Sequence, residues 1–209
     1  MSEGAAVRGR PRVGDPDTIS EIALILMARD GWTSTTMDGI ARASGVSTPT
    51  LFRYFPSKAA VLWHGMDENA ERFRSEFAAR RSQPSLLDAI FESYLAMLRA
   101  DAFRLRLIKT RIAIMEHDDE AAASSWSKFD EWRQLVTSFV ATARDEPEDA
   151  LPARVTGAAI WSALSSALSA WALTDDPDPA EHLRVARGCI AIPHGVGAYV
   201  ASPTPRSAK

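Results

Sequence analysis

Residues 35–58 have the sequence TTMDGIARASGVSTPTLFRYFPSK, and this stretch decides the fold. Apolar side chains at positions i, i+3 and i+4 share one face of a short helix, and here they are Met37, Ile40 and Ala41. Thr35 or Thr36 supplies a hydroxyl group that caps the start of that helix. Gly45 then permits the left-handed backbone that a tight turn between helices requires. The pattern predicts two short helices joined by a turn.

The second short helix is expected to carry the functional surface. Ser47 precedes it as a capping residue, and Leu51 and Phe55, four residues apart, are predicted to face the core. The opposite face offers hydroxyl, apolar and cationic groups that suit a DNA major groove. These residues are Thr48, Pro49, Thr50, Phe52, Arg53 and Tyr54. The alternative interpretation is an ordinary helical hairpin with a polar outer face.

The same stretch resembles the DNA-binding domain of the TetR family of one-component transcriptional regulators. The match rests on the pattern TT-x-x-x-IA-x-x-x-GVS-x-x-T, followed by F-x-SK, and it extends over residues 31–62. The resemblance implies contacts to base edges from Thr48, Pro49, Thr50 and Phe52. It implies contacts to phosphates from Thr36, Arg53, Tyr54 and Lys58. Alternatively, Lys58 is a solvated surface lysine and Tyr54 an aromatic side chain packed on the first helix.

Basic residues near the N-terminus suggest a second contact with DNA. Arg8, Arg10 and Arg12 lie in a segment spaced by glycine and proline, and such arms can enter a minor groove. A tail with incidental charge is an equally good interpretation. The net charge of the chain is −3, so DNA affinity is expected to depend on positioned contacts and on dimerisation.

Composition places the chain among globular proteins. It has 209 residues, of which 46% are hydrophobic and 24% charged, and no apolar run reaches the ~20 residues that span a bilayer. The N-terminal segment lacks the apolar core of a secretory signal, and Cys189, the only cysteine, is expected to be buried. We therefore expect a cytoplasmic protein without membrane contact.

The helical pattern continues to the end of the chain and predicts an all-α fold of about nine helices. We expect an arm at 1–15, a helix-turn-helix domain at 16–62, a ligand-binding and dimerisation domain at 63–200 and a tail at 201–209. A fourth helix is predicted to run unbroken from 57 to about 79. The resemblance implies that a homodimer forms through the eighth helix, 152–173, and the ninth, which begins at 175–179. Alternatively, the eighth helix is an internal core helix. Pro193, Gly195 and Gly197 are expected to interrupt the ninth helix.

Large apolar side chains in the second domain suggest a cavity for an amphipathic small molecule. The candidate lining residues are Trp63, Met66, Met97, Phe103, Arg111, Met115, Trp126 and Trp161. Taken singly, each of them is better explained as an ordinary core residue. Arg111 also belongs to a basic helix that could bind an anionic head group or could be a solvated face. Residues 104–120, RLRLIKTRIAIMEHDDE, resemble the TetR subgroup with an acyl-CoA-like ligand domain.

Catalytic motifs are lacking in the sequence. The four histidines are dispersed, and there is no HExxH, GxSxG or P-loop pattern. We expect no enzyme activity, no metal and no cofactor. The expected function is a ligand-responsive repressor that binds a pseudo-palindromic, double-stranded DNA operator as a homodimer. An activator with the same DNA reader, or a helical ligand carrier or interaction protein that does not bind DNA, is the alternative.

Overall fold

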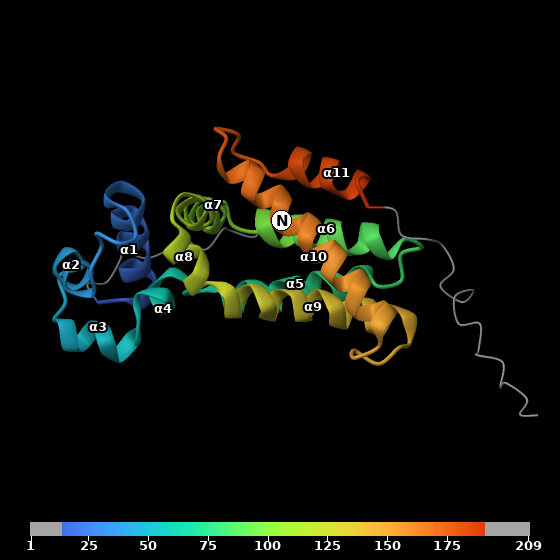
Figure 1. Ribbon diagram of the computed structural model, residues 1–209, viewed down its shortest axis with the longest axis horizontal. Helices are drawn as coiled ribbons and strands as arrows, with labels where there is room; N and C mark the ends of the chain where they lie inside the picture. Colours follow the sequence, from blue (N-terminus) through green and yellow to red (C-terminus); the bar gives the residue numbers. More distant parts are fainter. Residues whose placement is uncertain (1–13, 191–209) are drawn as a thin grey trace, which may run out of the picture.

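The structure is a computed structural model that describes residues 14–190. Within this range the chain is built from eleven helices without a strand, which confirms the all-α prediction (Figure 1). The helices are α1 (Pro16–Asp30), α2 (Met37–Ala43), α3 (Thr48–Tyr54), α4 (Lys58–Leu62), α5 (Met66–Arg80), α6 (Leu86–Arg99), α7 (Ala102–His117), α8 (Asp119–Ser124), α9 (Trp126–Arg144), α10 (Leu151–Ala172) and α11 (Ala180–Gly188).

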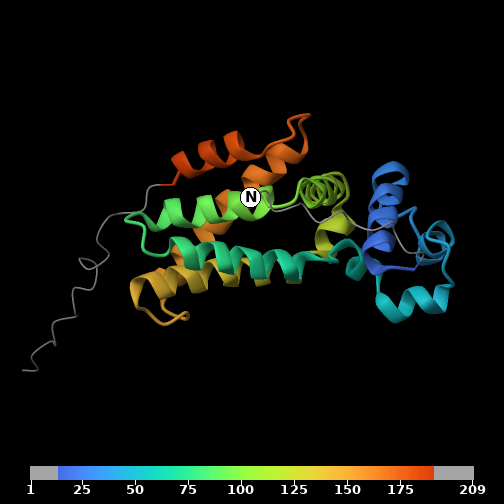
Figure 2. The same cartoon turned by 180° about the vertical axis from the view of Figure 1, so that it is seen from behind.

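The first four helices form a head at one end of the molecule, and α5 to α11 form a helical bundle (Figures 1 and 2). Two side-chain caps define the head as the sequence predicts. The Thr36 hydroxyl accepts a hydrogen bond from the Gly39 amide (3.1 Å) at the start of α2. Ser47 does the same for the Thr50 amide (3.3 Å) at the start of α3. Because both caps are local, they fix where each short helix begins.

The predicted unbroken fourth helix is wrong. It is divided into α4 and α5 by residues 63–65, which we call the joint. Gly65 has φ +78°, in the left-handed region, and a helix cannot continue through that conformation. The acidic residues Asp67 and Glu68 then occupy the first turn of α5, where the helix dipole favours negative charge.

The helical pattern also predicts one helix from the turn at 117–119 to about residue 144, but this helix is divided at Ser125 into α8 and α9. The Ser125 side chain is fully buried; its hydroxyl donates to the Ala121 carbonyl (2.8 Å) and accepts from Trp63 Nε1 (2.9 Å). This pair links the joint to the bundle. The two divisions account for eleven helices where nine were expected.

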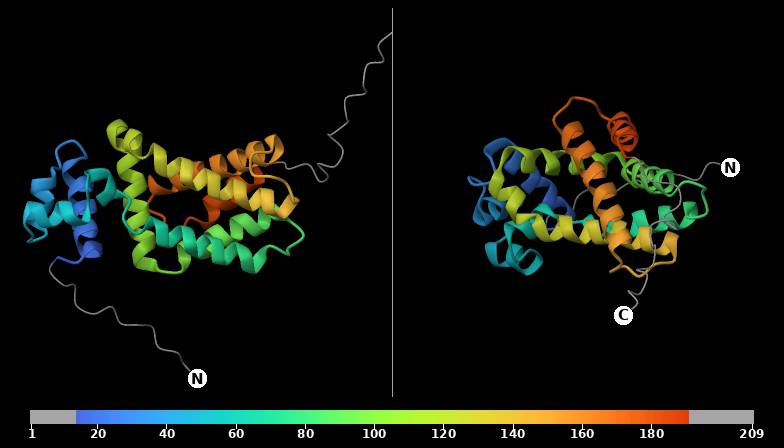
Figure 3. Two further views of the ribbon diagram at one scale, coloured as in Figure 1. Left: turned by 90° about the horizontal axis from the view of Figure 1, so that it is seen from below. Right: turned by 45° about the vertical axis from the view of Figure 1, so that its right-hand side comes forward.

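The bundle encloses an aromatic core. Phe73 of α5 packs against Tyr94 of α6 (centroids 5.1 Å apart) and Phe139 of α9 (5.0 Å), and Phe77 stacks on Phe139 at 4.2 Å. α9 and α10 pack against each other next to the loop that joins them and diverge toward the end of α10 (Figures 1 and 3). They come into close contact at Gly157, where no side chain separates α10 from Thr137 of α9.

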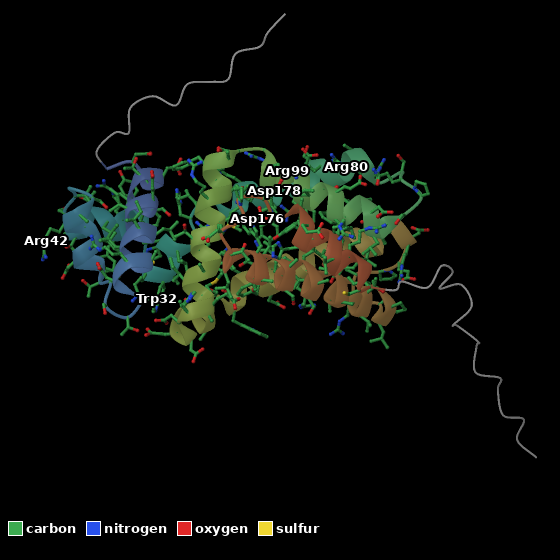
Figure 4. The ribbon with its side chains drawn as sticks, turned by 90° about the horizontal axis from the view of Figure 1, so that it is seen from above. Trp32, Arg42, Arg80, Arg99, Asp176 and Asp178 are labelled. Carbon is green, nitrogen blue, oxygen red and sulfur yellow. The ribbon has the colours of Figure 1, made fainter. Side chains whose placement is uncertain are left out.

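α7 crosses the molecule between the head and the bundle (Figures 1 and 4). Its residues Ile114 and Met115 join the buried cluster of the head, together with Ala121 of α8. The head therefore shares its core with the second domain. A displacement of α7 must act on the head, because packed interiors transmit small shifts.

The C-terminal part of the bundle is fixed by polar contacts. The Arg99 guanidinium pairs with Asp178 in the loop after α10, and Lys109 donates to the Asp176 carbonyl (2.6 Å). Figure 4 labels Arg99, Asp176 and Asp178. Cys189 is exposed, contrary to the prediction, because it follows the last residue of α11. The predicted interruption at Pro193, Gly195 and Gly197 lies outside the described residues. In the range 14–190, no helix is both long and apolar enough to cross a bilayer.

Candidate DNA-binding surface and effector cavity

α3 exposes the face that the sequence assigns to the major groove. Leu51 and Phe55 are 0% and 3% exposed in the core of the head, whereas Phe52 and Tyr54 are 47% and 40% exposed. Pro49 and Arg53 also face solvent. The helix lies at the outer end of the molecule, far from α11 (Figures 1 and 2). A duplex can therefore reach α3 without meeting the bundle.

Hydrogen bonds organise the polar groups of this face. The Thr48 hydroxyl donates to Asp38 Oδ1 (2.8 Å), and the Ser47 and Thr50 hydroxyls lie 2.8 Å apart. The Arg53 guanidinium lies 5.1 Å from the centroid of the Tyr54 ring. Such contacts hold side chains in place before DNA arrives, which lowers the entropy lost on binding. The sequence pattern did not predict that Asp38, in the first turn of α2, lies beside Thr48.

Lys58 forms contacts inside the head. Its ammonium group donates to the carbonyls of Trp32 (2.6 Å) and Thr35 (3.1 Å) and lies 4.2 Å from the centroid of the Trp32 ring. At least two of its three N–H groups are therefore engaged within the head. Lys58 therefore fixes the turn that positions Thr36.

Arg42 is a cation of the head that the site prediction left out. It is exposed at the outer tip, in the last turn of α2, and forms no ion pair within residues 14–190 (Figure 4). Its position suits a phosphate contact. The basic arm of Arg8, Arg10 and Arg12 lies outside the described residues.

The bundle contains a mainly apolar cavity of about 50 Å³. Six of the eight predicted residues line it: Trp63, Met66, Met97, Arg111, Met115 and Trp161. Tyr94, Phe129 and Trp132 also line the cavity, and the Trp132 and Trp161 rings stack at 6.0 Å. Two serines, Ser165 and Ser169 of α10, add polar groups to the wall.

Two predicted cavity residues lie elsewhere, so their assignment is wrong. Trp126 is 76% exposed, because α9 begins with it after the division at Ser125. Phe129 and Trp132, three and six residues later on α9, face the cavity instead. Phe103 lines a separate, more polar cleft between α1 and α7, beside Arg104 and His64.

Arg111 is the one charged cavity residue that is deeply buried within the described part of the chain, at 3% exposure. Its Nε donates to the Leu62 carbonyl, its Nη2 to the His64 carbonyl (3.1 Å), and its Nη1 lies 3.4 Å from Met66 Sδ. No carboxylate within residues 14–190 forms an ion pair with it, and burial lowers the pKa of Arg111 to about 10. One side chain thus contacts both the cavity and the joint.

Comparison with known proteins identifies the family. A model described as bacterial regulatory proteins, tetR family, matches residues 19–63, and one described as the MftR C-terminal domain matches residues 84–192. The mycofactocin biosynthesis transcriptional regulator MftR of Mycobacterium tuberculosis is 31% identical over 164 residues, 78% of this chain and 81% of that protein. The chain belongs to the TetR family. It is a DNA-binding transcriptional regulator, as residues 35–58 predict, and the carrier alternative has no support.

Two solved structures share the fold. NalD of Pseudomonas aeruginosa, a repressor of a multidrug efflux pump, has a TM-score of 0.58 at 18% identity, covering 83% of this chain and 93% of that chain. FadR of Thermus thermophilus, in complex with lauroyl-CoA, has a TM-score of 0.53 at 19% identity, covering 87% and 98%. At these identities the likeness shows the fold alone.

The contacts of Lys58 lead to a prediction for this TetR-family head. Lys58→Ala should lower the free energy of unfolding by about 1–3 kcal/mol, because two carbonyls lose a charged donor. DNA affinity should fall for all sequences alike, since the turn before Thr36 loosens. Chemical denaturation and fluorescence polarisation with two unrelated duplexes measure both effects. Weaker DNA binding with unchanged stability would instead indicate a direct phosphate contact.

Proposed function

We propose that the protein is a repressor that binds a pseudo-palindromic operator as a homodimer and leaves it when a small molecule enters the bundle. The observation that carries this proposal is the contact of Arg111 with both the cavity and the joint. The proposal assigns base contacts to Thr48, Pro49, Thr50 and Phe52 and phosphate contacts to Thr36, Arg53 and Tyr54. The exposed face of α3 supports this assignment.

The size of the cavity supports a mechanism of release. Its volume of about 50 Å³ is well below the ~300–1,000 Å³ of typical ligand pockets, so a ligand must displace lining side chains. Trp63 belongs to the joint itself, and Arg111 holds the carbonyls of Leu62 and His64. Enlargement of the cavity therefore acts on the orientation of the head. The ligand lowers operator affinity only by as much as it prefers the displaced form.

The exposed side of α10 supports the dimer. A row of uncharged residues at spacings of three and four runs along the whole helix: Leu151, Val155, Ala159, Ser162, Ser166, Ala170 and Leu173. Val185 of α11 adds a further exposed apolar side chain, at 51% exposure. Small residues allow two helices to approach closely across a two-fold axis. The two α3 helices of such a dimer would face half-sites one or more helical turns apart.

The lining of the cavity favours a long acyl thioester as the effector. Aromatic and methionine side chains suit an acyl chain, and the few polar groups can orient its carbonyl end. FadR of Thermus thermophilus, which has the same fold, is described with lauroyl-CoA. A planar aromatic compound is the second candidate, because the parallel Trp132 and Trp161 rings offer a stacking surface.

A gel-shift experiment with the DNA upstream of the protein's own gene tests the proposal. Lauroyl-CoA should release the DNA, whereas coenzyme A without an acyl chain should not. Release by a planar aromatic dye alone would favour the second candidate. DNA occupancy that is indifferent to these compounds and to cell extract would contradict the ligand-responsive mechanism and leave only DNA binding.

Arg111→Met provides a test of the coupling. The effector should reduce the operator affinity of the wild type by roughly fivefold or more, which is a typical allosteric coupling. It should reduce the operator affinity of the variant by less than about twofold. The reason is that the variant no longer joins the cavity to the carbonyls of Leu62 and His64. Isothermal titration must show that the variant still binds the effector. Equal responses of both proteins would exclude this role for Arg111.

A further inference from the structure

Asp38 places a carboxylate on the DNA-facing side of the head. It is the second residue of α2 and is exposed, and Thr48, its hydrogen-bond partner, is the first residue of α3. The two residues are ten positions apart in sequence, and the fold joins them at 2.8 Å. Since the N-terminal residues of a recognition helix meet base edges, the carboxylate lies where a base would be contacted.

The hydrogen bond fixes which groups the pair offers to DNA. An ionised carboxylate has acceptor sites only, so the Thr48 hydroxyl must be the donor. Its proton is then directed at Asp38, and the hydroxyl oxygen retains only lone pairs for another partner. The carboxylate also keeps free acceptor sites on both oxygens. The Asp38–Thr48 pair therefore presents acceptors and no donor.

Arg42, a possible ion-pair partner within the head, does not bind the Asp38 carboxylate. Arg42 follows four positions later on the same face of α2, a spacing at which ion pairs form. Nevertheless, among the residues described, Arg42 makes no ion pair with Asp38. The carboxylate thus remains available to a base, and Arg42 remains available to a phosphate.

The bases differ in what they display to such a group. In the major groove only cytosine N4 and adenine N6 carry hydrogen-bond donors. Guanine and thymine present acceptors, which cannot form hydrogen bonds with the acceptors of the Asp38–Thr48 pair. The adenine amino group has the acceptor N7 beside it, which repels a carboxylate, and cytosine has no such neighbour on its own edge. We infer that Asp38, oriented by Thr48, is a specificity-determining residue that selects cytosine at one position of each operator half-site.

This inference rests on the proposed placement of α3 in the major groove, and it predicts a change in DNA binding that the placement alone does not predict. A carboxylate close to the phosphates weakens binding to every sequence through repulsion. Its removal should therefore raise affinity for random DNA while abolishing the preference at one base pair. A purely structural role for Asp38, in the first turn of α2, would produce neither change.

Selection from a random duplex library with the full-length protein tests the inference. The wild type should enrich cytosine over other bases roughly tenfold at one position of each half-site. Asp38→Ala should lose that enrichment, keep the preferences at other positions and bind random DNA more tightly at low salt. Thr48→Val should weaken the same preference, because the carboxylate loses the hydroxyl that orients it.

Glu21→Gln is the matched control. It removes the same charge from α1, on the side of the head that lines the cleft toward α7. Its selected sequences should equal those of the wild type, and thermal unfolding must show that all variants fold. An Asp38→Ala protein with unchanged preferences, or a wild type that selects a base other than cytosine there, would overturn the inference. If the wild type enriches no sequence at all, the proposed operator binding fails as well.

Discussion

Ser162→Arg is expected to convert the protein to a monomer and to lower its affinity for a full operator roughly a hundredfold. The reason is that linked binding of two half-sites increases affinity by a factor of about 10²–10⁴. Ser162 lies in the middle of the uncharged row on α10. In an interface between two copies, a guanidinium at this position would be buried without a partner, at high cost. Light scattering at micromolar concentration gives the mass, and fluorescence polarisation compares a full operator with a single half-site.

Ser75→Arg is the control for this prediction. Ser75 is also an exposed serine, but it lies on α5, outside the row. The control should remain a dimer and keep full operator affinity. If Ser162→Arg also remains a dimer, the proposed interface is wrong. If it becomes a monomer with undiminished operator affinity, the protein does not need two copies to hold DNA.

Gly157→Ala is expected to destabilise the protein by about 3 kcal/mol, the upper part of the usual range for overpacking. A Cβ at this position would lie 2.6 Å from Thr137 Cα and 2.9 Å from Thr137 Cβ. Because the first of these atoms is backbone, α9 and α10 must separate along their contact. Urea denaturation followed by circular dichroism measures the loss.

Two further variants test whether the clash with Thr137 causes the loss of stability in Gly157→Ala. Gly188→Ala, at the end of α11, adds the same methyl group where no atom lies within 4 Å, and it should be nearly neutral. Thr137→Ala combined with Gly157→Ala should recover only part of the lost stability, because the Thr137 backbone is unchanged. A Gly157→Ala protein as stable as the wild type would mean that the helices separate at little cost.

The head was predictable because its signals are local. Capping residues, a turn glycine and apolar spacing within residues 35–58 define α2 and α3 without reference to the rest of the chain. Gly65 was a visible signal for the joint, but a glycine in a helical pattern is often tolerated, so its left-handed conformation could not be derived from the sequence.

The contacts that depend on tertiary packing could not be predicted in the same way. Lys58 meets the Trp32 carbonyl across 26 positions, and Arg111 meets the Leu62 carbonyl across 49. No periodicity encodes such pairings. Trp126 and Phe103 show a related difficulty: a large apolar residue in the sequence does not reveal whether it is buried, as the exposed Trp126 shows, or which cavity it faces, as Phe103 shows. Because the buried Ser125 precedes α9, the helix begins at Trp126, and Phe129 and Trp132 then face inward.

The hydrogen bond between Trp63 and Ser125 has an optical consequence. It places an indole ring at the joint, where Trp63 also meets Phe129 edge-on at 5.7 Å. Indole emission depends on the polarity around the ring, and Trp63 is only 9% exposed. Motion of the joint would open this ring to water and shift its emission to longer wavelength. The protein therefore carries an intrinsic fluorophore at the joint, the element through which we propose that the cavity and the DNA-binding head communicate.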